Sequence, residues 1–189
     1  MPTRDEALQL LNEWVPNPAL RNHMKSVEAA VRWYARKRGA NEEDWGYAGL
    51  LHDLDWEKYP EEHPLRAVDE LRKLGYKEEI LHAILAHRPD FTNTPIESDL
   101  DKHLFACDEI TGLITATAYM RPTRIDDLTA KSVIKKMKDK AFARGVSRED
   151  VQQGAEMIGV PLDEHIQNVI EAMQAIAGEL GLSAQPSAP

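Results

Sequence analysis

Residues 17–39, NPALRNHMKSVEAAVRWYARKRG, predict a long amphipathic helix with both ends marked. Asn17 before Pro18 is a typical helix start, because the asparagine side chain caps free backbone N–H groups and proline fits the first turn. Gly39 is a typical helix end. His23 lies on the apolar face of this segment. That face recurs every three to four positions and consists of Leu20, Met24, Val27, Ala30, Val31 and Tyr34.

The same helical spacing continues along the chain, and no stretch alternates with period two long enough to predict a strand. Further helices are predicted from Thr3, from Asn41 to His52, over 64–75, 77–87, 98–120 and 129–144, from Ser147, and over 162–180. The sequence therefore predicts an all-α protein of about nine helices. It predicts one domain over residues 1–182, with a core at about 18–120, C-terminal helices at about 129–181 and a flexible tail at 183–189.

The composition excludes several classes of function. The 189 residues carry 23 basic and 32 acidic side chains, a net charge of −9. This charge argues against non-specific nucleic-acid binding and against docking on an anionic membrane. The segment before residue 15 lacks the pattern of a signal peptide, and the longest uncharged stretch, 110–120, is too short to span a membrane. With Cys107 as the single cysteine, we expect a soluble cytoplasmic protein, and whether it forms a homo-oligomer stays open.

Histidines and aspartates stand at helix ends or on inward helix faces. Asp53 directly follows an apolar run and His52, a place where a charge is rarely buried unless it is paired or bound to a metal. Helical bundles build metal sites from side chains on facing helices. Nitrogen and oxygen ligands without a thiolate suit Fe, Mn, Co, Ni, Zn or Mg. The candidate ligands are His23, His52, Asp53, His63, His87 and Asp108.

Each of these residues taken alone also has a structural explanation. His23 fits a hydrogen-bonded core histidine, and Asp108 fits a salt bridge to a buried arginine. The other candidates fit helix caps. The remaining histidines are interpreted as structural, for His82, or as surface residues, for His103 and His165. The four tryptophans, among them Trp56, are interpreted as core or rim packing, and Cys107 as a small buried residue.

The ordered set of ligands resembles the HD-domain superfamily of metal-dependent phosphohydrolases, which is named for its His-Asp pair. The resemblance covers about residues 18–120 and implies an all-α fold. It implies a first metal held by His23, His52, Asp53 and Asp108, and a second metal that shares Asp53 and binds His63 and His87. The sequence departs from the family in reading His-Asp-Leu-Asp at 52–55 where many relatives read His-Asp-Ile-Gly. The Gly-Tyr-Pro signature of cyclic dinucleotide phosphodiesterases is absent.

The resemblance implies a hydrolase that uses one or two divalent transition metals per chain to form a hydroxide near neutral pH. Its substrate would be a phosphorylated small molecule or nucleotide. We expect Asp53 and Lys58 to be catalytic, and Arg88, Lys131, Lys135 and Lys138 to bind phosphate. The last three lie in a segment, 131–144, that has six cationic side chains and one aspartate, and a solvated helix face is the alternative. A dinuclear-iron oxygenase of the same fold and a catalytically silent nucleotide sensor also stay open.

Overall fold

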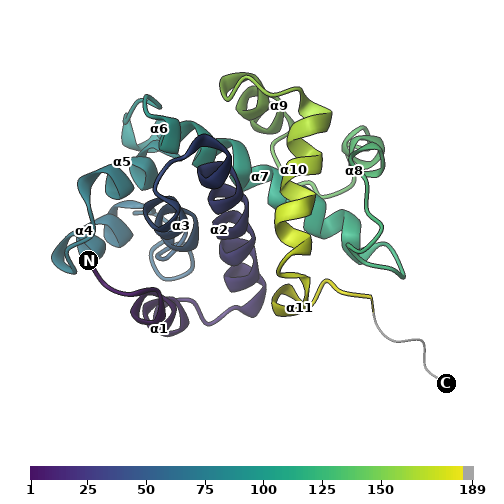
Figure 1. Cartoon of the computed structure of the whole chain (residues 1–189). Helices are drawn as coiled ribbons and strands as arrows, with labels where there is room; N and C mark the ends of the chain where they lie inside the picture. The colour runs from purple at the N-terminus through teal and green to yellow at the C-terminus, as the bar shows by residue number, and fades with distance from the viewer. Residues whose placement is uncertain (185–189) are drawn as a thin grey trace. The chain divides into compact units, whose positions relative to one another are not determined.

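The computed structural model describes residues 1–184, which contain eleven helices and no strand (Figure 1). The predicted all-α fold is therefore confirmed. The helices are α1 (Arg4–Trp14), α2 (Pro18–Arg38), α3 (Glu42–Leu51), α4 (Leu65–Lys73), α5 (Glu78–Ala86), α6 (Pro89–Thr92), α7 (Asp99–Tyr119), α8 (Ala130–Met137), α9 (Arg148–Met157), α10 (Leu162–Gln174) and α11 (Ala177–Leu180). The four-residue helix α6 is additional to those that the sequence predicts, and the helix predicted over 162–180 is interrupted at 175–176, so that its last turn is α11. Of the predicted tail, residues 185–189 lie outside the described residues.

The predicted signals are present at the starts of α1 and α2. At α1 the Thr3 hydroxyl accepts from the Glu6 N–H, and the Glu6 carboxylate accepts from the Thr3 N–H at 2.7 Å. The hydrogen bonds from Thr3 lower the pKa of Glu6. At α2 the Asn17 side chain accepts a backbone N–H two residues later, and Gly39 ends the helix with φ +65°. These ends place His23 in the second turn of α2.

Helices α2 and α3 approach each other closely at Gly49. A Cβ atom at this position would lie 2.8 Å from the Cα of Glu28, closer than real Cβ contacts. The Glu28 carboxylate is buried there and accepts from Arg4 at 2.8 and 3.0 Å and from Arg32 at 2.9 Å. Because only glycine permits this approach, the end of α3 lies against the first half of α2.

The chain divides into two compact units, residues 1–105 and residues 106 onward. Helix α7 begins in the first unit and continues into the second. Within the second unit, α9 approaches Ala106 through Gly154, where an added Cβ would lie 2.6 Å from the Ala106 Cα. The imidazole of His165 on α10 is 2.9 Å from the carbonyl oxygen of Ala106. The single domain predicted for residues 1–182 stays a prediction.

Two histidines interpreted as surface residues are buried, so that interpretation is wrong. His165 forms the contact with Ala106 described above. The His103 ring lies between Tyr34 and Trp45, with ring centroids 4.9 Å away in both cases. Burial lowers the pKa of His103. The polar neighbours of both histidines in the sequence point to other helix faces and do not report on their surroundings.

The helix predicted over residues 129–144 is shorter than expected, since α8 ends at Met137. Residues 138–147 form turns instead, in which Ala143 has φ +45°. The Arg148 guanidinium donates to four backbone carbonyls of these turns, at Asp139, Phe142, Ala143 and Val146. These bonds replace the helical ones that the sequence predicts, and a run of cationic side chains adds like-charge repulsion against a longer helix.

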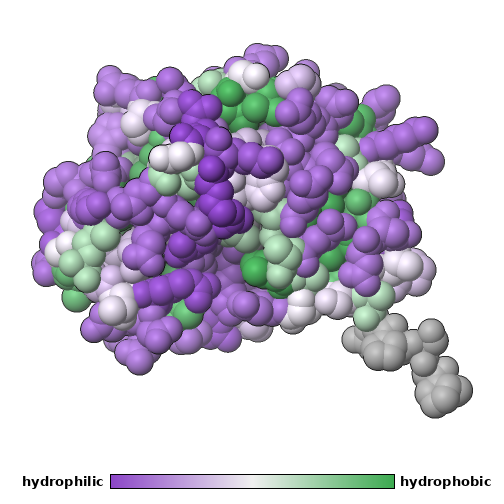
Figure 2. All heavy atoms as spheres, in the orientation of Figure 1, coloured by the Kyte–Doolittle hydropathy of each residue, from purple (hydrophilic) through white to green (hydrophobic). Residues whose placement is uncertain are grey.

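The described residues contain no helix of the length and apolarity needed to cross a lipid bilayer. The face drawn in Figure 2 is largely hydrophilic, with smaller hydrophobic areas between the polar side chains. This surface agrees with the net charge of −9.

Replacing Gly49 with Ala tests the close approach of α2 and α3. We expect the free energy of unfolding to fall by about 1–3 kcal/mol, because the new methyl group overpacks the contact with Glu28. The measurement is urea unfolding followed by circular dichroism. The matched control is Gly178→Ala, where an added Cβ has no heavy atom within 4 Å. Equal stability of Gly49→Ala and the native protein would contradict this packing.

Candidate metal centre

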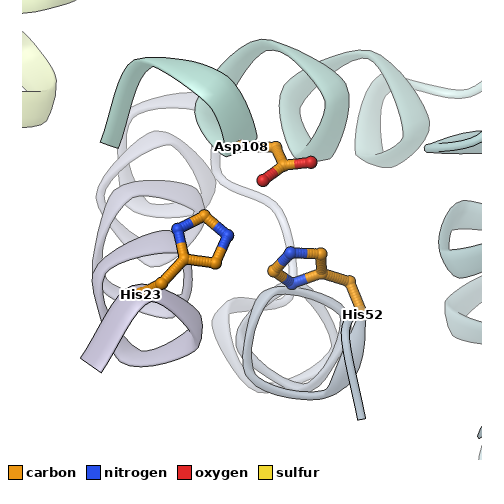
Figure 3. Close-up of side chains that lie close together, drawn as sticks. All are labelled: His23, His52 and Asp108. Atoms are coloured by element: carbon orange, nitrogen blue, oxygen red, sulfur yellow. The ribbon is translucent and has the colours of Figure 1, made fainter. Parts of the chain in front are cut away.

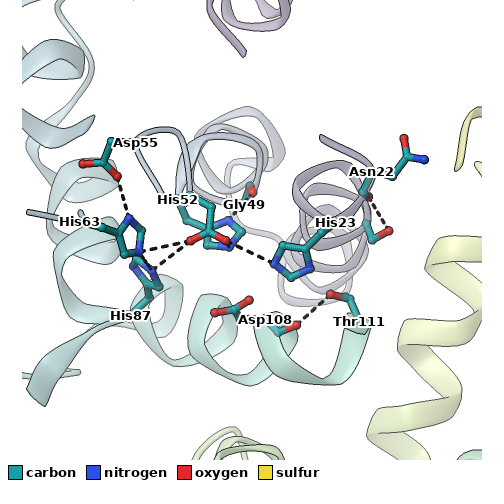
Figure 4. Close-up of polar contacts among 11 residues, drawn as sticks. Asn22, His23, Gly49, His52, Asp55, His63, His87, Asp108 and Thr111 are labelled. Atoms are coloured by element: carbon teal, nitrogen blue, oxygen red, sulfur yellow. Dashed lines mark hydrogen bonds and ion pairs between the residues drawn. The ribbon is translucent and has the colours of Figure 1, made fainter. Parts of the chain in front are cut away.

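The predicted histidine ligands of the first unit lie at the ends of helices or in the turns that follow. His52 is the C-cap residue of α3, and His87 is the C-cap residue of α5. His63 lies in the turns between α3 and α4, and His23 lies on α2. His52, His63 and His87 are buried, whereas His23 is partly exposed. Four histidines from separate segments therefore converge in the first unit (Figure 4).

Hydrogen bonds at Nδ1 fix the tautomers of the three buried histidines. Nδ1 of His52 is 2.9 Å from the carbonyl oxygen of Gly49, and Nδ1 of His87 contacts the carbonyl oxygen of Ile84. A carbonyl oxygen only accepts, so Nδ1 carries the proton in both rings. Nδ1 of His63 donates in the same way to a carboxylate of Asp55 at 2.7 Å. In its neutral form, each ring therefore presents Nε2 with its lone pair, the form that binds a metal ion.

The carboxylate of Asp53 divides its two oxygens between two pairs of histidines. Oδ1 lies 3.3 Å from Nε2 of His63 and 3.7 Å from Nε2 of His87. Oδ2 lies 3.5 Å from Nε2 of His52 and 3.8 Å from Nε2 of His23. Metal bonds to nitrogen and oxygen are about 2.0–2.2 Å long, so two ligands of one ion lie roughly 3–3.5 Å apart. The spacing around Asp53 is close to that range on both sides.

Asp53, His63 and His87 offer ligand atoms that all lie within 4.8 Å of one another. The two Nε2 atoms of His63 and His87 are 3.1 Å apart. In the tautomers described above, both atoms carry lone pairs, which repel at this distance unless a cation or a proton lies between them. A divalent ion relieves that repulsion and is balanced by the carboxylate charge, so the residues present fit a metal ion.

Asp55 is a functional residue that the sequence analysis missed. Its carboxylate is fully buried, accepts from Nδ1 of His63 at 2.7 Å and accepts from the backbone N–H of Ala67 at 2.8 Å. A carboxylate behind a ligating histidine orients the ring and raises its basicity. The sequence signal that could have identified Asp55 is its place as the second aspartate of His-Asp-Leu-Asp, which departs from the family pattern.

His23 and His52 lie with their ring centroids 5.3 Å apart in an edge-to-face arrangement (Figure 3). Asp108 lies on the part of α7 that belongs to the second unit. Its backbone carbonyl accepts from the Thr111 hydroxyl at 2.8 Å. The role of Asp108 as the distal ligand stays a prediction.

The predicted catalytic residue Lys58 and the predicted phosphate-binding residue Arg88 lie over aromatic rings. The Lys58 ammonium is 4.5 Å from the centroid of the Trp14 ring and 5.7 Å from that of Tyr59. The Arg88 guanidinium carbon is 5.8 Å from the centroid of the Trp56 ring. Trp56 in turn presents an edge-to-face contact to the His63 ring at 5.0 Å. The contacts therefore connect Arg88 to the histidine cluster through Trp56, whereas they hold Lys58 against Trp14.

The three predicted lysines of the second unit are exposed. Lys131 and Lys135 lie on α8, and Lys138 is its C-cap residue. Their predicted roles in binding the substrate stay predictions. In the same unit, burial and then the charge of Asp108 raise the pKa of the Cys107 thiol. Cys107 is buried as predicted, and a thiol in this state is a poor nucleophile.

Residues 20–113 match the family model of the HD domain. The chain therefore belongs to the HD-domain superfamily, as the resemblance predicts. The matched range includes all six candidate ligands, and the family together with the His/Asp groups indicates a metal-dependent hydrolase that binds a divalent metal. Neither the search of curated proteins nor that of solved structures gave a match.

Replacing Asp55 with Asn tests the role of this carboxylate behind His63. One oxygen of Asp55 accepts from His63 and the other from Ala67, and asparagine replaces one of these oxygens with an NH2 donor, so one of the two hydrogen bonds is lost. We expect metal affinity to fall by about 10–100-fold, the usual effect of losing such a support. The measurement is competition with a chelator followed by elemental analysis. Asp69→Asn, an exposed position, is the matched control. Unchanged affinity in a folded Asp55→Asn protein would contradict the role.

Proposed function

We propose that this protein is a metal-dependent phosphohydrolase that cleaves a phosphate ester or anhydride of a nucleotide-like substrate. The observation that carries the proposal is the division of the Asp53 oxygens between two pairs of histidines. A carboxylate in this arrangement suits two ions that share one ligand. The proposed ligand set is His23, His52, Asp53 and Asp108 for one ion, and Asp53, His63 and His87 for the other.

Divalent ions at these residues would polarise a phosphoryl group and lower the pKa of water to near neutral. The residues of the chain would hold the ligand atoms of these ions in place. Asp53 contributes negative charge to both ligand groups, and Asp55 holds His63 with Nε2 directed inward. Burial of His52, His63 and His87 excludes water from the ligand atoms, which strengthens their electrostatic interactions with a bound ion. The imidazoles need no large rearrangement to bind.

Trp56 and Arg88 support a substrate that has an aromatic group beside its phosphate. The Trp56 ring is 43% exposed although it contacts the buried His63 ring. An exposed indole beside a metal centre offers a face on which a nucleobase can stack. The guanidinium of Arg88 lies near that ring and can donate a fork of hydrogen bonds to a phosphate. In this proposal, Trp56 lies at the rim of the site and also stacks on the base of the substrate.

The proposal is tested by metal content and turnover of the Asp53→Asn variant. We expect the native protein to hold one or two divalent transition metals per chain and to hydrolyse nucleotide or aryl phosphates. Loss of the shared carboxylate should lower kcat by about 10³-fold or more, because the affinity and the charge of both sites depend on it. Asp69→Asn is again the control.

Retained hydrolysis by metal-free Asp53→Asn would overturn the assignment of the site. Oxygen consumption by the ferrous protein without phosphate release would support the oxygenase alternative instead. A rise in melting temperature with a nucleotide but no turnover would support the sensor.

Replacing Trp56 with Ala tests the stacking role separately. We expect KM for a nucleotide substrate to rise roughly tenfold, since stacking of a base on an aromatic side chain contributes about 1–3 kcal/mol. KM for methyl phosphate, which has no aromatic group, should stay unchanged, and Trp56→Phe should restore most of the nucleotide affinity. An equal rise in KM for both substrates would show that Trp56 supports His63 and does not bind the substrate.

A further inference from the structure

The second unit contains a cavity of about 530 Å³ at the junction of α8, the turns 138–147, α9 and the start of α10. This volume is typical of sites for small organic ligands. None of the predicted metal ligands lines it. The lining residues are Ile134, Met137, Lys138, Lys140, Arg144, Val146, Arg148, Gln152 and Leu162.

The charge of the lining is entirely positive. Lys138, Lys140, Arg144 and Arg148 contribute four cations, and no aspartate or glutamate is among the lining residues. Within residues 1–184, the side chains of Lys138, Lys140 and Arg144 form no ion pair. These cations give the cavity a positive potential within a protein of net charge −9. The complementary ligand is an anion.

The turns that line the cavity are held in a defined conformation. Arg148 donates to four of their carbonyls, which include that of Ala143, and Ala143 has φ +45°. A non-glycine residue with positive φ is strained, and such strain is typical of functional sites whose surroundings keep it in place. The Nε atom of Arg148 is buried and has no hydrogen-bond partner among the described residues.

The remaining lining is mostly apolar. Ile134 and Met137 come from α8, Val146 from the turns and Leu162 from α10, and all four are only partly buried. An inorganic anion would leave these side chains facing water, whereas an apolar molecule without charge would leave the cations unmatched. The lining therefore selects a ligand that has an apolar body and an anionic group.

We propose that this cavity binds a small organophosphate, a molecule with an alkyl or aryl body and one terminal phosphate. Phosphate is favoured over carboxylate because its two negative charges and three terminal oxygens match several cations at once. The proposal is independent of hydrolysis at the metal centre, since it uses none of the predicted metal ligands.

The test is calorimetric titration of the metal-free full chain with octyl phosphate, octanol and inorganic phosphate. Removing the metal keeps phosphate from binding at the histidine cluster. We expect octyl phosphate to bind at least about tenfold more tightly than either of the other probes, because only it uses both the cations and the apolar lining. Added salt should weaken its binding by screening the cations.

Two double variants with the same loss of charge separate the cavity from the general charge of this segment. Lys140→Gln with Arg144→Gln removes two lining cations and should weaken octyl phosphate binding about tenfold. Arg124→Gln with Lys136→Gln removes two cations of the same unit that neither line the cavity nor are predicted to bind the substrate, and should leave binding unchanged. Met137→Gln should weaken octyl phosphate but not inorganic phosphate.

Three results would overturn the proposal. The first is equal binding of octyl phosphate and inorganic phosphate, which would indicate a surface that attracts anions without contribution from the apolar lining. The second is equal weakening by both double variants, which describes non-specific attraction. The third is the absence of octyl phosphate binding by a protein whose melting curve is native. Because no readout uses turnover, these results do not depend on whether the metal centre hydrolyses phosphate.

Discussion

The contact of α2 with α3 at Gly49 is the constraint on which the rest of the site depends. It sets the distance between the helix that carries His23 and the helix that ends at His52. Asp53 follows immediately, so its carboxylate enters the space between these segments and the turns that carry His63. The close packing of these two backbones, which leaves no room for a Cβ atom at position 49, therefore fixes the geometry of a cluster drawn from several parts of the chain.

The sequence predicts those parts of the fold that local rules determine. The capping residues Thr3, Asn17 and Gly39 and the apolar spacing of α2 locate helices because both act within one or two turns. The end of α8 at Met137 was missed, because it depends on Arg148 reaching back to carbonyls of the turns before it. His165 was interpreted as a surface residue for the same reason, because its burial depends on Ala106, which is far away in the sequence.

The candidate site was predictable as a set of residue types in order, but not as a geometry. The order of histidines and aspartates gives the six candidate ligands and the family. It does not reveal that the two oxygens of Asp53 face different pairs, or that Asp55 lies behind His63, because both depend on how the turns after α3 fold back. The contact of the exposed Trp56 with the buried His63 ring was not predictable for the same reason, since it is a tertiary property.

The backbone carbonyls that receive Nδ1–H of His52 and His87 have a consequence for how the protein acquires its ions. Each ring is oriented by the last turn of its own helix, through Gly49 and Ile84, and not by an ion. In the proposed metal centre, the orientation of these two rings therefore does not require a bound ion. The ion that binds would then depend on which metal is abundant in the surroundings as much as on the protein.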